Sequence, residues 1–106
     1  MGLPSLSAEQ RAAALEKAAA ARRTRAQIKE RLKRNGTSLA EVLAAADSNE
    51  VIGKLRVAEV LESMPGVGTI RAAELMERLG IAPSRRLRGL GSKQRGALER
   101  EFPARS

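Results

Sequence analysis

Two short stretches of this sequence have the residue types and spacing to hold a phosphate group. The first is the turn Pro65-Gly66-Val67-Gly68. Proline cannot continue a helix and presets a turn, while glycine tolerates positive φ and leaves the backbone N–H groups uncovered. If a helix begins at this turn, its first N–H groups point outward, which is an arrangement that binds anions. From the turn alone, phosphate binding and an ordinary tight helical hairpin are equally good interpretations.

The second stretch is Arg85-Arg86-Leu87-Arg88-Gly89-Leu90-Gly91, in which three arginines lie within four residues. A guanidinium group binds a phosphate through two hydrogen bonds and also fits a narrow minor groove of DNA. We expect Leu87 and Leu90 to anchor the segment to the core, so that the arginines point outward. A structural role, in which an arginine pairs with Glu74 or Glu77, would account for one of them but not for all three.

Composition excludes most catalytic chemistry. The chain has 106 residues, no Cys, no His and a single aromatic residue, Phe102. Most nucleophile–base pairs and nearly all transition-metal sites are therefore absent. We also find no paired carboxylates in a plausible cleft and no aromatic wall for a flipped base. The sequence predicts a protein that is not an enzyme, with no catalytic residue, no metal, no cofactor and no small-molecule substrate.

Charge is segregated along the chain, whose formal net charge is +8. Residues 1–34 carry nine Lys/Arg and three Glu, and residues 85–106 carry seven Lys/Arg and two Glu. Residues 35–84 between them carry four Lys/Arg against seven Asp/Glu. Two basic segments thus flank a slightly acidic middle. Such segregation is typical of a protein that binds a polyanion, whereas scattered charge would only favour solubility.

Apolar spacing and helix caps predict an all-α fold. Ser7 and Gln10 form a capping box for a long helix from residue 8 to about 34, which Asn35-Gly36 ends. The apolar face of this helix is thin outside Ile28 and Leu32, so we expect its first half to project from the body. The spacing then predicts helices over about 39–46, 57–64, 69–79 and 92–102, with a short helical turn capped by Asn49. No polar–apolar alternation indicates a strand.

The combination of motifs resembles the actinobacterial integration host factor family over nearly the whole chain. The resemblance rests on the Ala- and Arg-rich first helix, Arg31-Leu32-Lys33-Arg34, the Gly53-Lys54 turn, the Pro65–Gly68 turn and the arginine segment. It implies a basic N-terminal helix over residues 1–36 and a helix-two-turn-helix DNA-binding domain over residues 37–106. It also implies a nucleoid-associated protein that binds and deforms duplex DNA with little sequence preference and assists phage integrase at attachment sites.

The resemblance also implies which residues contact DNA. Gly66, Val67 and Gly68 would face a backbone phosphate, and the main contacting arginines would be Arg85, Arg86 and Arg88. The full predicted set of DNA-contacting residues is Lys33, Arg34, Lys54, Gly66, Val67, Gly68, Thr69, Arg71, Arg85, Arg86, Arg88, Gly89 and Lys93.

The turn of this chain departs from the pattern of the family. Thr69 stands where members usually carry Lys after Gly-Val-Gly, and Ala73 stands where some carry Lys. Arg71 is then the only cation close to the turn in the sequence. We therefore expect the turn to orient the protein on the DNA backbone, and the arginine segment to supply most of the affinity.

Two other functions remain open on the sequence. Structured RNA is one alternative partner, because a ribosomal protein family shares the helix-two-turn-helix module. The other alternative is a protein-interaction module that uses the basic helix.

We expect a monomer in solution, because a mostly Ala stripe disfavours a stable coiled coil. No apolar run has membrane-spanning length and the segment Met1–Leu6 does not resemble a signal peptide, so we expect a cytoplasmic protein that acts on the nucleoid and contacts no membrane.

Overall fold

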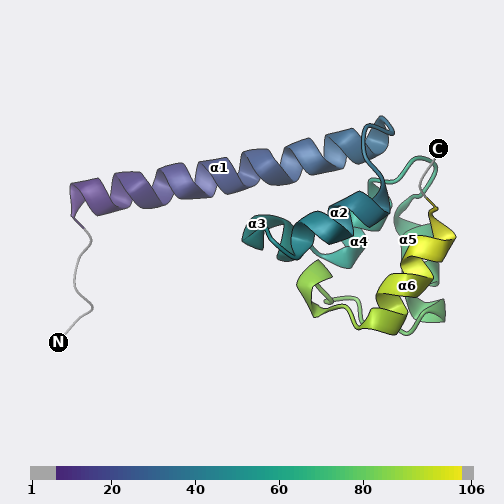
Figure 1. Ribbon diagram of the computed structural model, residues 1–106. Coiled ribbons are helices and arrows are strands. Elements are labelled where there is room, and N and C mark those ends of the chain that lie inside the picture. The colour runs from purple at the N-terminus through teal and green to yellow at the C-terminus, as the bar shows by residue number, and fades with distance from the viewer. Residues whose placement is uncertain (1–6, 104–106) are drawn as a thin grey trace.

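The computed structural model describes residues 7–103, and these form a long helix attached to a small helical body (Figure 1). The elements in order are α1 (Ala8–Lys33), α2 (Leu39–Ala46), α3 (Glu50–Gly53), α4 (Val57–Glu62), α5 (Thr69–Arg78), a 3-10 turn η1 (Leu87–Gly89) and α6 (Ser92–Glu101). The all-α prediction is confirmed for this part of the chain, where the β-structure is a single isolated bridge between Arg56 and Arg86. The expectation about Met1–Leu6 lies outside the described residues. None of the helices in residues 7–103 is both long enough and apolar enough to span a membrane.

Helix α1 is capped at both ends as its sequence predicts. The Ser7 side chain accepts a hydrogen bond from the Gln10 amide, and the Gln10 side chain accepts one from the Ser7 amide. At the other end Asn35 takes a left-handed conformation with φ of 57°, and the Gly36 amide donates to the Arg31 carbonyl at 2.8 Å. This is the Schellman arrangement, in which an Asn or Gly reverses the chain.

Only the last third of α1 packs on the body. Leu32 is fully buried and Ile28 is half-buried, whereas nearly all the side chains before Ala21 are exposed. The first half of the helix therefore projects beyond the body, as Figure 1 shows. The radius of gyration of 16.3 Å reflects this shape, because a compact chain of this length would have a radius of gyration of about 13 Å.

The body encloses one aliphatic core. Its fully buried side chains are Leu32, Leu39, Val42, Leu43, Leu55, Val57, Val60, Leu61 and Leu98.

Asn49 caps α3 by accepting hydrogen bonds from the amides of Val51 and Ile52, as predicted. The cap of α2 differs from a capping box. Ser38 accepts from the Glu41 amide, but the Glu41 carboxylate accepts from the Thr37 hydroxyl instead of reaching back to Ser38.

Val67 anchors the turn between α4 and α5 to the core. Gly66 has φ of 76°, a conformation that favours glycine, and the Val67 side chain is buried. Gly68 in the same turn does not bring two helices close together. Its φ is −95°, and a Cβ atom built on it would have no neighbour within 4 Å. Its small size leaves the turn open to solvent instead.

Helix α6 closes the body against α2. Leu98 is buried and Phe102 is half-buried. Arg95 donates to the Asp47 carboxylate at 2.9 Å and lies 3.5 Å from the Glu99 carboxylate. This hydrogen bond lowers the pKa of Asp47. Arg95, one of the cations of the basic C-terminal segment, is thus neutralised by an ion pair within the body.

Candidate nucleic-acid interface

The arginine segment is fixed to the body by backbone hydrogen bonds to the segment before α4. The Val57 amide donates to the Arg85 carbonyl, and the Leu87 amide donates to the Leu55 carbonyl, both at 2.9 Å. These two bonds form the isolated antiparallel bridge, and Leu87 is buried beside it. The segment is therefore held on both sides of Arg86, which gives the arginines a firm base.

Two of the three arginines make hydrogen bonds to carbonyl groups. Arg86 Nη1 donates to the Lys54 carbonyl at 2.9 Å, and Arg85 Nη1 donates to the Gly89 carbonyl at 3.1 Å. Each guanidinium keeps several unused donors, since it has five N–H groups. Within residues 7–103, none of the three arginines forms an ion pair with a carboxylate, and all three are exposed. Their positive charge is thus available to an external anion.

Gly53 brings α3 against Arg88. A Cβ atom at position 53 would lie 3.1 Å from the Ala46 carbonyl oxygen and 3.4 Å from the Arg88 Cβ. Gly53 is buried, although it belongs to a helix of only four residues. The absence of a side chain lets the η1 turn sit directly on α3. We call the exposed cations gathered here, Lys54, Arg85, Arg86 and Arg88, the α3–η1 surface.

One carboxylate lies among these cations. Lys54 Nζ is 2.9 Å from the Glu50 carboxylate. The hydrogen bond from Lys54 lowers the pKa of Glu50, and the charges of Lys54, Lys17 and Arg88 lower it further. Lys17 on the projecting half of α1 therefore lies close enough to act on the α3–η1 surface. Glu50 neutralises only part of this charge, so the surface remains basic.

The turn between α4 and α5 offers free backbone donors. Gly68 is the N-cap of α5, and no side chain caps this helix. Within the described chain, the amides of Thr69, Ile70 and Arg71 donate to no protein acceptor, and the first amide of α5 that does so belongs to Ala72. Val67 differs from its sequence prediction. Its side chain is buried and its amide donates to the Met64 carbonyl at 3.0 Å, so it anchors the turn and offers no free donor.

The structure separates the turn from the arginine segment. Pro65 borders a groove formed by residues 35–39 and by Glu101, Phe102 and Pro103. In Figure 1 the end of α6, which borders this groove, lies on the side of the body away from α3. The predicted residues therefore fall into two groups on different parts of the body. They do not form one continuous site.

The remaining predicted residues lie outside both groups. Lys33 lines a groove with Glu59 and Glu62 of α4, so its surroundings are acidic. Arg34 pairs with Glu30 at 3.5 Å on the exposed side of α1. Lys93 is exposed in the first turn of α6.

Sequence reasoning missed the roles of Gly53 and Lys17. The sequence marked Gly53-Lys54 as a turn, but nothing local shows that Arg88 packs on this glycine. Lys17 is one of several cations on α1, and only the docking angle of α1 decides that it lies near Glu50. No group of three or more acidic, His or Cys side chains in residues 7–103 is arranged to hold a metal ion.

Comparison with known proteins gives consistent matches. Residues 32–102 match the model of the S13-like H2TH domain. The chain is 64% identical to the integration host factor of Streptomyces coelicolor over 96% of its length and 95% of that protein. It is 61% identical to the integration host factor of Mycobacterium tuberculosis, over 96% of this chain and 97% of that protein. Among solved structures it is similar to sIHF bound to an 8 bp palindromic DNA, with a TM-score of 0.81 and 62% identity over 82% of this chain and 98% of that one.

Proposed function

Because the chain belongs to the actinobacterial integration host factor family and carries an S13-like H2TH domain, we propose that it is a nucleoid-associated protein that binds double-stranded DNA. The observation that carries this proposal is the α3–η1 surface, where three exposed arginines form no ion pair within the described residues. The solved sIHF structure, which contains DNA, supports duplex DNA over structured RNA.

The binding mode follows from the chemistry of the surface. Guanidinium and ammonium groups recognise phosphates without reading the base sequence. The protein therefore binds many sequences with similar affinity. The free amides at the start of α5, together with Thr69 and Arg71, hold a second phosphate away from the first contact. Two contacts on different parts of the body favour bent or bridged DNA over straight DNA, and this supports compaction and assistance to phage integrase.

We propose the following division of labour. Residues 1–36 act as a basic arm that lies along DNA with Lys17 as a phosphate contact, and Lys33 and Arg34 contact DNA separately, where the arm joins the body. Residues 37–106 form the helix-two-turn-helix body, to which Lys93 adds a further contact. The free protein is a monomer that acts in the cytoplasm on the nucleoid, without catalysis, cofactor or small-molecule substrate.

A salt titration with duplexes of unrelated sequence tests the electrostatic mechanism. With about six phosphates neutralised, raising the salt from about 50 to 200 mM lowers the affinity on the order of a thousandfold. We expect the same slope for every sequence. A slope near zero would overturn the electrostatic account, and stronger binding of structured RNA in competition would overturn the assignment to DNA.

A matched pair of variants tests the α3–η1 surface. Arg85→Gln with Arg88→Gln removes two charges there, and Arg78→Gln with Arg100→Gln removes two charges elsewhere on the body. The second pair also breaks the ion pair of Arg78 with Glu101, which is exposed and therefore contributes little to stability. We expect the first pair to weaken binding to all duplexes by at least about tenfold, on the order of 1.4 kcal/mol, and the second pair to weaken it much less. Equal losses would show that only total charge matters. Thermal unfolding should change little in both.

A further inference from the structure

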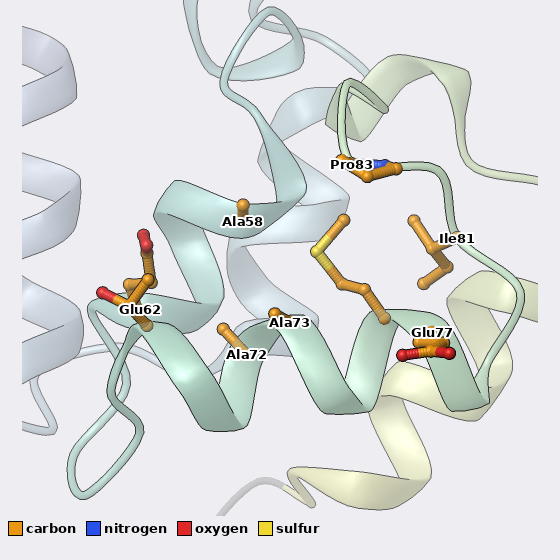
Figure 2. Close-up of a pocket in the computed structure, with 9 residues that line it drawn as sticks. Ala58, Glu62, Ala72, Ala73, Glu77, Ile81 and Pro83 are labelled. Carbon is orange, nitrogen blue, oxygen red and sulfur yellow. The ribbon is translucent and has the colours of Figure 1, made fainter.

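An apolar groove between α4 and α5 lies beside the proposed phosphate contact at the start of α5, and Thr69 borders both. Its cavity of about 420 Å³ is lined by Ala58, Ala72, Ala73, Met76, Ile81 and Pro83. Figure 2 shows Glu62 and Glu77 at opposite ends of the groove. Neither carboxylate forms an ion pair within residues 7–103. The carboxylates repel DNA, so a fitting occupant has an apolar side chain between two positive charges.

The projecting half of α1 presents such a pattern. Leu15 leaves 70% of its surface exposed, although it is a large apolar side chain. Its neighbours one turn away on the same face are Arg11, Ala12, Ala18 and Ala19, and Arg22 follows one turn further on. Leu15 therefore protrudes from a flat alanine surface. Arg11 and Arg22, eleven residues apart, lie about 16 Å from each other along the helix.

Leu15 points away from the body that carries it. At about 100° per residue, its direction differs by about 160° from that of Lys17 and by about 140° from that of Ile28. Ile28 packs on the core, and Lys17 is near enough for its charge to act on Glu50, so Leu15 lies on the opposite side of the helix. Because Ile28 and Leu32 fix α1 to the body, the groove of the same chain cannot receive Leu15.

We propose that Leu15 of one copy inserts into the α4–α5 groove of a second copy, with Arg11 and Arg22 placed near Glu62 and Glu77. This contact is much smaller than the roughly 1,200 Å² of a stable interface, so it is too weak to hold free copies together. It forms between copies that are bound side by side on one duplex, where their effective concentration is high. The inference thus rests on the proposed DNA binding. A contact between neighbouring protein molecules would then contribute to the compaction of DNA.

Disulfide trapping tests this contact, because the natural chain has no Cys. Leu15→Cys and Ala73→Cys are made as separate variants, since both side chains are exposed and neither is among the proposed DNA contacts. The two proteins are mixed on a duplex long enough for several copies and oxidised. We expect the mixed Leu15→Cys with Ala73→Cys product to exceed each homodimer several-fold, and to form faster than without DNA.

The matched control is Ala13→Cys, which lies on the same helix about 160° away from Leu15. Equal trapping of Ala73→Cys by Ala13→Cys and by Leu15→Cys would overturn the proposal, as would the absence of the mixed product. A mobility shift of each variant on a short duplex measures DNA binding by itself. If DNA binding fails, the mixed product should still form slowly at high protein concentration without DNA, so failure of the contact and failure of the proposed function are distinguishable.

Discussion

At the scale of single residues, three glycines have three different roles. Gly53 is required by packing, since a Cβ atom there would press on the Ala46 carbonyl and on Arg88. Gly66 is required by its backbone, because its φ of 76° strains other residues. Gly68 is required by neither, as it has ordinary φ and open space. Its remaining effect is to leave the first amides of α5 uncapped, which is useful to a ligand but not to the fold.

Replacing Gly68 with Asn separates these two effects. Asn is a better N-cap than Gly, so we expect Gly68→Asn to raise the free energy of unfolding by a few tenths of a kcal/mol. Its side-chain oxygen would occupy the amides at the start of α5 without changing the net charge. DNA affinity should therefore fall on every duplex while thermal stability rises. Unchanged affinity in a mobility shift would show that these amides hold no phosphate.

At the scale of elements, α1 has strong caps but little packing. Its sequence of Ala, Arg, Lys, Glu and Leu favours a helix by intrinsic propensity, and both ends are hydrogen-bonded. The body holds it mainly through Leu32 and Ile28. Because most helical stability in proteins comes from packing, the projecting half should open more readily than the docked half. Contacts of DNA with Lys17 and its neighbours would stabilise the projecting half, so that it would open less readily than the docked half.

Two leucines on α1 provide a matched test of how it is docked. Leu32→Ala removes a fully buried side chain, so we expect a loss of about 2–5 kcal/mol in the free energy of unfolding. Leu15→Ala removes an exposed one, and we expect a change within about 0.5 kcal/mol. Urea unfolding measures both. Similar values for the two variants would contradict the packing of α1 on the body.

Hydrogen exchange of the backbone amides also tests how α1 packs on the body. We expect the amides of residues 12–20 to exchange faster than those of residues 28–33 in the free protein, because the former lie in the unpacked half. Addition of duplex DNA should slow exchange in the first group if the arm lies along DNA. If saturating duplex leaves the exchange of residues 12–20 unchanged, the arm makes no ordered contact with it.

At the scale of the whole molecule, the fold turns a charge pattern along the chain into separate surfaces. Arg85, Arg86, Arg88 and Lys54 gather at α3 and η1, close to Lys17 of the arm. The acidic middle of the chain forms the α4–α5 groove and the side of α4 that faces Lys33. The protein can therefore present a basic surface to DNA and an acidic, apolar groove to another protein at the same time.

The ion pair between Asp47 and Arg95 makes stability depend on acidity. The hydrogen bond from Arg95 holds the pKa of Asp47 below its ordinary value of 3.8. Since the pKa is lower in the folded state, the contribution of this pair is fully present above the unfolded pKa and is lost as the pH falls through the folded one. We expect Asp47→Asn to unfold at a lower temperature than the natural protein at neutral pH, because it lacks this ion pair. That difference should shrink below about pH 4, and its persistence at the lowest pH would show that charge is not its cause.

Much of the local structure could be predicted from the sequence because its causes are local. The caps at Ser7, Asn35 and Asn49 depend on residues within a few positions, and all three are present. The apolar spacing along α1, α2, α4, α5 and α6 likewise identified most of the core. The Ser38 cap of α2 lacks the return hydrogen bond of a capping box, because the Glu41 carboxylate accepts from the Thr37 hydroxyl instead.

The sequence by itself determined that this protein is a set of capped helices with a segregated charge, and its motifs were specific enough to indicate the family. The tertiary structure alone decided which cations lie together. It brought Lys17, Lys54 and Arg88 around Glu50, and it placed the α4–α5 turn on another part of the body. The reason is physical: helix formation depends on neighbours in the chain, whereas the position of a charge depends on how distant helices pack around the core.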